Sequence, residues 1–337
     1  MRLSRTAALL AGISTLLALP AALAAERVQV VTSFSILADM VENVGGEHVE
    51  VTALVGPDSD AHVYSPRPTD ARDLAGADLV VFNGLQYEGW IERLIEASDV
   101  NGPLVVTTDG IEARLAAQAN DDHNDHNDHN DHNDHDDGHD HGDIDPHAWQ
   151  DLGMGELYVA NILAGLIKAD PDNSAAYEAR AERYREEMAA VDSELRMLLA
   201  EIPPGTSVIT GHDSFGHFAR AYGLTFLSPQ GLSTEAEPSA ANMARLIDVI
   251  REENVQALFH ENMTSPAMID QLAEETNLTV AGTLYADALA SDGEASTYLG
   301  MMRHNARTLH DALAEPGHEE DDHGDDEHGH DDHGHAH

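Results

Sequence analysis

The residues of this chain best suited to chemistry are its histidines, of which it has 22. Fourteen of them fall in two tracts that are also rich in acidic residues, one between Asp121 and Asp145 and one from Glu315 to the end. Imidazole and carboxylate groups are common ligands of divalent cations, and His-rich tracts are typical of metal binding. The two tracts therefore predict metal cations as the partner class.

The other eight histidines are spread along the chain, at His48, His62, His147, His212, His217, His260, His304 and His310. None of them belongs to the His-Glu-x-x-His pattern of a metalloprotease, because His260-Glu261 has no second histidine four positions on. An ordered metal site must therefore be assembled from segments that are distant in sequence, and spacing alone does not identify it.

The elements that would position such a site alternate between short apolar runs and helical patterns, which predicts α/β units around largely parallel sheets. The predicted strands of the first half are Val28–Thr32, Val49–Val55, Asp78–Phe82 and Leu104–Thr107. Those of the second half are Ser207–Thr210, Thr225–Leu227, Gln256–Phe259 and Leu278–Ala281. Helices are predicted over Ile36–Val44, Trp90–Ala97, Gly155–Ala169 and Ala295–Leu313.

A long helix is predicted between the two halves, over residues 170–202. Asp170 is expected as its N-cap and Pro171 as its first helical residue, and Pro203 ends it. Apolar residues spaced alternately by four and three positions form one stripe along it, namely Tyr177, Ala181, Tyr184, Met188, Val191, Leu195 and Leu198. About 31 residues would extend roughly 46 Å, enough to connect two lobes and pack against both.

The first residues predict an exported protein. Arg2 and Arg5 precede an apolar run over 7–19, and Ala22-Leu23-Ala24 is a small-x-small cleavage site, a pattern typical of a secretory signal peptide. The alternative is an uncleaved membrane helix, but the run is shorter than the ~20 residues that a span needs. The sequence contains no cysteine, which excludes disulfides and a lipid-anchored cysteine. We therefore expect a soluble periplasmic protein.

Length and charge limit the organisation and the partners. After cleavage about 310 residues remain, more than one core usually supports, so two domains are expected. The predicted divisions are a signal peptide (1–24), an N-terminal lobe (25–169) with a disordered His/Asp-rich loop (118–144), the linking helix (170–202), a C-terminal lobe (203–314) and a disordered tail (315–337). The net charge of −45 argues against binding to nucleic acids and against binding to anionic lipid surfaces.

Four segments in this order resemble the zinc- and manganese-binding solute-binding proteins of ABC importers, the ZnuA, TroA and PsaA group. They are Gly56-Pro57-Asp58-Ser59-Asp60-Ala61-His62-Val63-Tyr64-Ser65-Pro66, Asp145-Pro146-His147-Ala148-Trp149, Gly211-His212-Asp213-Ser214-Phe215-Gly216-His217-Phe218 and Leu284-Tyr285-Ala286-Asp287-Ala288-Leu289. The resemblance covers roughly residues 28–313 apart from the loop. Each segment supplies one metal ligand in that family, which implies His62, His147, His212 and Asp287 as the ligands here.

The resemblance implies two α/β lobes joined by one long helix, with the metal in the cleft between them and limited lobe closure. Three imidazoles and one carboxylate suit tetrahedral Zn²⁺, and four protein ligands leave no open position for an activated water. Manganese-binding relatives tend to carry glutamate where this chain has His212, so Zn²⁺ is the expected metal. We expect His217 to lie outside the site, and His48, His260, His304 and His310 to be structural or solvated.

The expected function is therefore that of a non-enzymatic, monomeric periplasmic zinc receptor that delivers the ion to an inner-membrane ABC permease. A periplasmic zinc chaperone is a candidate partner for the His-rich loop. Three alternatives remain open: a zinc buffer or metallochaperone without a transporter, a zinc-dependent hydrolase, and a surface adhesin. The chain departs from the family pattern in lacking a C-terminal disulfide and in having Gln150-Asp151-Leu152 where Leu-Asp-Pro is usual.

Overall fold

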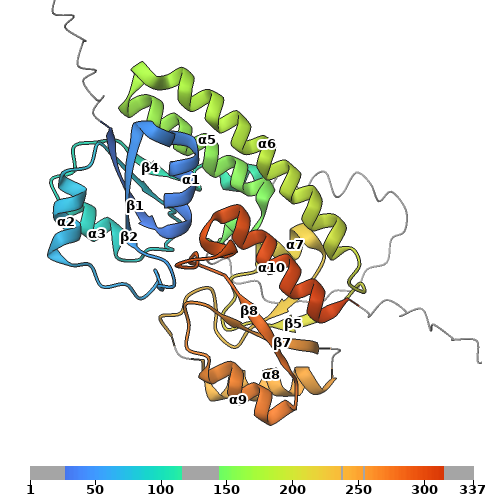
Figure 1. Cartoon of the computed structure of the whole chain (residues 1–337). Helices are drawn as coiled ribbons and strands as arrows, with labels where there is room; N and C mark the ends of the chain where they lie inside the picture. The colour runs from blue at the N-terminus through green and yellow to red at the C-terminus, as the bar shows by residue number, and fades with distance from the viewer. Residues whose placement is uncertain (1–26, 116–143, 237, 253–254, 315–337) are drawn as a thin grey trace, which may run out of the picture.

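The chain folds into two α/β lobes, as expected, each built on a four-stranded sheet (Figure 1). The computed structural model describes residues 27–115, 144–236, 238–252 and 255–314. The predicted signal peptide, the predicted tail and all but Ile144 of the predicted His/Asp-rich loop lie outside the described residues. Every strand pairing within the two sheets is parallel.

The N-terminal sheet has the strand order β2-β1-β3-β4. Its strands are β1 (Val28–Phe34), β2 (Val49–Val55), β3 (Leu79–Phe82) and β4 (Leu104–Val106). Runs of valine and leucine form these strands because a parallel sheet covered by helices is buried on both faces. The helices of this lobe are α1 (Ser35–Gly45), α2 (Pro68–Ala75), α3 (Ile91–Glu96) and α5 (Leu152–Ala169).

The C-terminal sheet repeats this order as β6-β5-β7-β8. Its strands are β5 (Ser207–Ile209), β6 (Thr225–Leu227), β7 (Val255–Glu261) and β8 (Val280–Leu284). Its helices are α7 (Gly216–Tyr222), α8 (Ala240–Glu252), α9 (Ala267–Thr276) and α10 (Tyr298–Leu313). The strand predicted over 278–281 lies further along the chain, because its pairing with β7 runs from Val280 opposite Leu258 to Leu284 opposite Glu261.

The long helix, α6, covers Ser174–Leu199 and is shorter than predicted, at 26 residues or roughly 39 Å. The predicted start was wrong, because a separate 3₁₀ turn over Pro171–Asn173 precedes α6. Asp170 does not cap the helix; its carboxylate accepts hydrogen bonds from the side chains of Asn173 and Tyr177, both at 2.7 Å. The apolar stripe is buried as predicted except at its end, where Leu199 replaces Leu198 because a 3.5-residue repeat drifts around a 3.6-residue helix.

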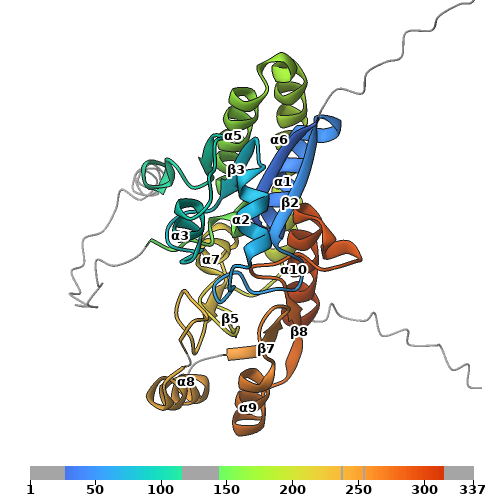
Figure 2. The ribbon, with the colours of Figure 1, turned by 90° about the vertical axis from the view of Figure 1, so that its left-hand side faces the viewer.

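One apolar core joins the two lobes through α6. α6 packs against α1 and α5 of the N-terminal lobe and against α7 and α10 of the C-terminal lobe. The core cluster continues from the N-terminal sheet through α6 into α10, whereas a separate small cluster lies under α8 and α9. In both views α8 and α9 lie at the end of the molecule farthest from α5 (Figure 1, Figure 2).

Among the described residues, α5 alone has the length and apolar composition that could cross a membrane. It packs against α6, α1 and the strands β3 and β4, which is how a core helix of a globular lobe is covered.

Candidate metal centre

The four residues of the predicted site come from loops at one edge of each sheet. His62 follows β2, His212 follows β5 and Asp287 follows β8, so all three leave the carboxyl ends of parallel strands. His147 immediately precedes a 3₁₀ turn over Ala148–Gln150, which leads into α5. Parallel α/β sheets commonly bind ligands outside the carboxyl ends of their strands. In this topology the edge of each sheet formed by the carboxyl ends of its strands faces the other lobe.

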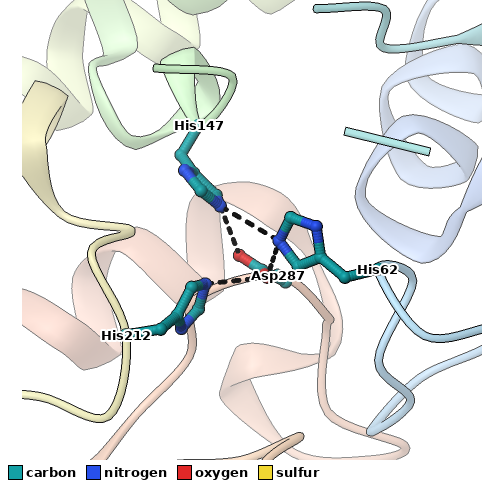
Figure 3. Close-up of side chains that lie close together, drawn as sticks. All are labelled: His62, His147, His212 and Asp287. Atoms are coloured by element: carbon teal, nitrogen blue, oxygen red, sulfur yellow. Dashed lines mark hydrogen bonds and ion pairs between the residues drawn. The ribbon is translucent and has the colours of Figure 1, made fainter. Parts of the chain in front are cut away.

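The side chains of these four residues converge on one point (Figure 3). Their potential ligand atoms all lie within 4.8 Å of one another. The Asp287 carboxylate is 3.3 Å from His62 Nε2, 3.2 Å from His212 Nε2 and 3.6 Å from His147 Nε2. The Nε2 atoms of His62 and His147 are 3.4 Å apart. The structure thus brings together the four residues that the sequence analysis selected.

The cluster is buried and contains polar atoms without hydrogen-bond partners. His147, His212 and Asp287 are 0% exposed and His62 is 3% exposed. Within the described residues, His212 Nε2 and both carboxylate oxygens of Asp287 make no hydrogen bond. Burying polar atoms that have only one another as neighbours and no hydrogen bond is costly, and a bound cation is one group that would satisfy all of them at once. The residues present therefore fit a metal ion.

Two carboxylates behind the cluster fix the orientation of two imidazoles. Asp145 Oδ1 lies 2.8 Å from His147 Nδ1, and Glu261 Oε2 lies 2.6 Å from His212 Nδ1. The same two carboxylates accept the backbone N–H groups of His147 and His212, at 3.0 Å each. When Nδ1 donates to a carboxylate, Nε2 is left as the free ligand atom directed into the cluster. His62 is held differently: its ring packs edge-on against the ring of Tyr87, with 4.6 Å between the two ring centroids.

The electrostatics of the cluster favour an ionised carboxylate at its centre. Burial opposes the charge of Asp287, but the neighbouring His212 and His147 hold its pKa well below the usual range. Burial likewise opposes protonation of His212, yet Glu261 and Asp287 raise the pKa of its imidazole well above the usual value. The neighbouring imidazoles thus stabilise the ionised Asp287 carboxylate, and a divalent cation at this point would stabilise it in the same way.

The remaining described histidines lie outside the cluster. His217 is buried, and its Nε2 donates to the backbone carbonyl of Asp145 at 3.1 Å. His260 contacts Asp270, His304 contacts the Thr283 carbonyl, and His310 contacts Glu201. His48 is edge-on to Tyr177. The structure thus places all five residues, including His217, outside the cluster.

Sequence reasoning missed the two orienting carboxylates. Asp145 was detectable, because it stands two residues before His147 in the Asp-Pro-His-Ala-Trp segment. Glu261 is 49 residues from His212 and ends β7, so that no local pattern connects the two. Only the parallel pairing of β5 with β7 brings the Glu261 carboxylate beneath His212.

Comparison with known proteins shows which family the chain belongs to. The model of the family described as "ZnuA: Zinc-uptake complex component A periplasmic" matches residues 30–312. The chain belongs to this family. It is 30% identical over 295 residues to the "Manganese-binding lipoprotein MntA" of Bacillus subtilis (strain 168), covering 86% of this chain and 90% of the relative. It is 29% identical over 288 residues to the "Iron-binding protein YfeA" of Yersinia pestis, covering 85% and 86%.

The fold is shared with solved members of the group. The periplasmic zinc-binding protein TroA from Treponema pallidum superposes with a TM-score of 0.76 at 26% identity, covering 86% of this chain and all of that one. This member of the ZnuA family is thus a metal-binding solute-binding protein of an ABC importer and not an enzyme. It acts outside the cytoplasmic membrane together with a membrane permease and an ATPase.

Proposed function

We propose that this protein is a Zn²⁺ receptor, with His62, His147, His212 and Asp287 as the ligands of the transported ion. The observation that carries the proposal is the convergence of three imidazole nitrogens and one carboxylate, with His212 Nε2 and both Asp287 oxygens left without hydrogen bonds. A nitrogen-rich set of four protein ligands is the donor chemistry that tetrahedral Zn²⁺ prefers.

The spacing of the donor atoms supports a tetrahedral site. Four ligands at the usual Zn–N and Zn–O bond lengths stand ~3.3 Å from one another at the corners of a tetrahedron. The closest separations between Asp287 and the three imidazoles, and between His62 and His147, are 3.2 to 3.6 Å. The remaining two separations, from His212 to His62 and from His212 to His147, are no longer than 4.8 Å, so the imidazoles need only short side-chain movements to receive the ion.

The names of relatives leave the metal open, since they include a manganese-binding, an iron-binding and a zinc-binding protein. The ligand set of this chain is what favours zinc. Three imidazoles form a softer site than two imidazoles with two carboxylates, and Zn²⁺ lies above Mn²⁺ and Fe²⁺ in intrinsic affinity for nitrogen donors.

The setting that we propose for the receptor is the periplasm, in a monomeric form without a lipid anchor. The basis is the signal-like pattern over 1–24 and the absence of cysteine, the residue that carries the lipid of a lipoprotein. We further propose that the His-rich loop receives zinc from a periplasmic chaperone. A zinc-loaded chaperone donor measured with and without residues 121–141 would test this transfer, which the deletion should slow.

The ligand assignment is tested by competition titration with a zinc chelator on protein that lacks both His-rich tracts. His62→Ala, His147→Ala and His212→Ala should each raise the dissociation constant by at least about 10-fold, because a three-ligand site remains. Asp287→Ala should weaken binding less, since water can replace one oxygen ligand. His260→Ala is the matched control, because that imidazole is bonded to Asp270 outside the cluster and its loss should leave the affinity unchanged.

Near-normal affinity in any one of the three histidine variants would remove that residue from the site. Metal content read by mass spectrometry after exposure to equal concentrations of Zn²⁺ and Mn²⁺ tests the choice of metal. Zinc should fill the site almost completely, and equal loading of the two metals would refute the zinc assignment even if all four ligands were correct.

A further inference from the structure

The segment that carries His62 is attached to both lobes within a few residues. On the side of the N-terminal lobe, Trp90 Nε1 donates a 2.7 Å hydrogen bond to the carbonyl of Ala61. On the side of the C-terminal lobe, Asp60 accepts a 2.7 Å hydrogen bond from the hydroxyl of Thr234, which lies between β6 and α8. His62 therefore follows directly after a point at which the two lobes are joined.

Asp60 connects this junction to the ligand itself. One oxygen of its carboxylate accepts the hydrogen bond from Thr234, and the other accepts the backbone N–H of His62 at 2.9 Å. A carboxylate has two oxygens, so a single side chain can hold the ligand's backbone and the opposite lobe at the same time. Any movement of the Thr234 loop away from the N-terminal lobe must pull on Asp60 or break one of these two bonds.

A second carboxylate in the same segment makes a parallel attachment. Asp58 accepts hydrogen bonds from the Asn262 side chain and from the Ser291 backbone N–H, both at 3.0 Å. Its own N–H donates to the carbonyl of Leu289 at 2.9 Å. Asn262 and Leu289 belong to the loops that follow β7 and β8, the latter being the loop that carries Asp287. This outer attachment is exposed, so water competes with it more than with the half-buried Asp60 bond.

The bond between Asp60 and Thr234 also borders a cavity of about 650 Å³. Asp60, Val63 and Thr234 line this cavity together with Met243, Met263 and Met268. His62 is the one ligand of the four with a measurable exposed fraction, 3% against 0% for the others. Val63, the residue that follows His62, is 52% exposed and lines this cavity, so of the four segments that carry the cluster the His62 segment borders the cavity.

We propose that Asp60 and Thr234 form a clasp that controls how fast the metal leaves, by holding His62 against the three ligands donated by other segments. Neither residue is a ligand; both are positioning residues. While the bond is intact, His62 stays in the cluster and covers its solvent side. When the C-terminal lobe moves and the bond opens, the backbone of His62 loses its fixed acceptor and the site loses one imidazole toward the cavity.

This inference rests on the proposed ligand set and is tested by metal-release kinetics on the full chain. The chain has two tryptophans, and both lie beside the cluster: Trp90 bonds Ala61, and the Trp149 ring is 5.3 Å from that of His147. The His-rich tracts contain no tryptophan, so intrinsic fluorescence reports on this site without their contribution. Stopped-flow mixing of zinc-loaded protein with excess chelator then gives the release rate.

Thr234→Val keeps the side-chain shape but removes the hydroxyl, and should raise the release rate by about tenfold, within the range of effects that outer-sphere partners of metal ligands exert. The association rate should change by less than about twofold, because the ligands themselves are intact. Asp60→Ala should release the ion faster still. Thr234→Ser retains the hydroxyl and should restore slow release, and so should Asp60→Asn, whose amide can accept from His62 and donate to Thr234.

The conservative variants distinguish the hydrogen-bonded connection from the charge of Asp60 as the cause of slow release. If Asp60→Asn released zinc as fast as Asp60→Ala, the charge of Asp60 rather than the connection would be responsible, and the proposal would be wrong. Unchanged release from Thr234→Val would also overturn it. His62→Ala, measured in the same experiment, separates the ligand assignment from the clasp. A normal release rate in His62→Ala would contradict the ligand assignment. Fast release in His62→Ala together with normal release in Thr234→Val would contradict the clasp alone.

Discussion

At the scale of single residues, the candidate site depends as much on the groups behind the histidines as on the histidines. An imidazole has two ring nitrogens, and only the one that is not engaged elsewhere can bind a cation. Asp145 and Glu261 engage Nδ1 of His147 and His212, which leaves both Nε2 atoms facing Asp287. In the proposed site these two carboxylates therefore select Nε2 as the ligand atom, and neither belongs to the group of four residues that could hold a metal ion.

Glu261→Leu should weaken zinc binding by about 10- to 100-fold, because His212 would lose both the acceptor for its ring N–H and the acceptor for its backbone N–H. Glu261→Gln should have an intermediate effect, since one amide oxygen can still accept one of these bonds. Chelator competition on tract-free protein measures both variants. Asp270→Asn, which alters the carboxylate beside the non-cluster His260, is the matched control.

Affinities of both Glu261 variants equal to that of the unaltered protein would show that His212 is oriented by packing alone. A drop in unfolding temperature of the metal-free protein with unchanged affinity would assign Glu261 a purely structural role.

His212→Glu should narrow the gap between zinc and manganese affinities, mainly by weakening zinc. The change turns three imidazoles and one carboxylate into two of each, a harder set that accommodates the oxygen-rich coordination of Mn²⁺. Direct competition read by mass spectrometry gives the ratio of bound metals. His212→Ala is the reference that shows the effect of losing the imidazole without gaining a carboxylate. A zinc-to-manganese ratio in His212→Glu equal to that of the unaltered protein would mean that geometry and not donor type sets the preference.

At the scale of elements, the lobes are tied together by helix ends as well as by α6. Asp39 on α1 accepts the backbone N–H of Tyr298, the first residue of α10, at 3.0 Å. The same carboxylate lies 3.5 Å from the Tyr184 hydroxyl on α6. It is half-buried, and burial, opposed by these hydrogen bonds, raises its pKa to about 6. Asp39 thus places a titrating group at the junction of three helices.

Asp39→Asn should stabilise the metal-free protein near neutral pH but not in acid. The folded-state pKa of Asp39, about 6, is above its ordinary value of 3.8. Stability from the protonated group is therefore complete below pH ~4 and is lost as the pH rises through 6. The loss corresponds to at most about 3 kcal/mol, and the asparagine variant avoids it while keeping an acceptor for Tyr298.

Urea unfolding of the two proteins at pH 4.5 and pH 7.5, with chelator present, measures this difference. The advantage of Asp39→Asn should be small at the lower pH and should grow toward the higher pH. Asp73→Asn, at an exposed acidic residue on α2, is the control and should show no such trend. A difference between Asp39→Asn and the unaltered protein that does not vary with pH would contradict a raised pKa at Asp39.

At the scale of the whole molecule, the two lobes supply complementary parts of one site. His62 comes from the N-terminal sheet, His212 and Asp287 from the C-terminal sheet, and His147 from the turn before α5. One continuous core through α6 and α10 fixes the position of one lobe relative to the other. This shared core opposes a large rotation of one lobe relative to the other.

Deleting residues 121–141 should lower the total amount of zinc bound per chain but leave the tightest site intact. Histidine and aspartate alternate in that stretch, so it offers many weak, interchangeable sites, whereas the four clustered residues lie elsewhere. Equilibrium dialysis gives the stoichiometry, and tryptophan fluorescence gives the affinity of the clustered site. Loss of the tight site on deletion would show that the ligand assignment is wrong.

The sequence alone determined the α/β class, the alternation of strands and helices, and the long helix in the middle of the chain, because hydrophobic period and Gly/Pro signals are local properties. The two lobes were expected from the chain length and from the family resemblance. It did not determine where α6 begins or where β8 lies, since the 3₁₀ turn at Pro171 and the pairing with β7 outweigh local preference. His62, His147, His212 and Asp287 were selected through their flanking residues. Only the tertiary structure decides three further features: the convergence of these four side chains, the position of the Glu261 carboxylate beneath His212, and the Asp60–Thr234 bond. The physical reason is that the contacts involved join residues 49 to 225 positions apart in the chain.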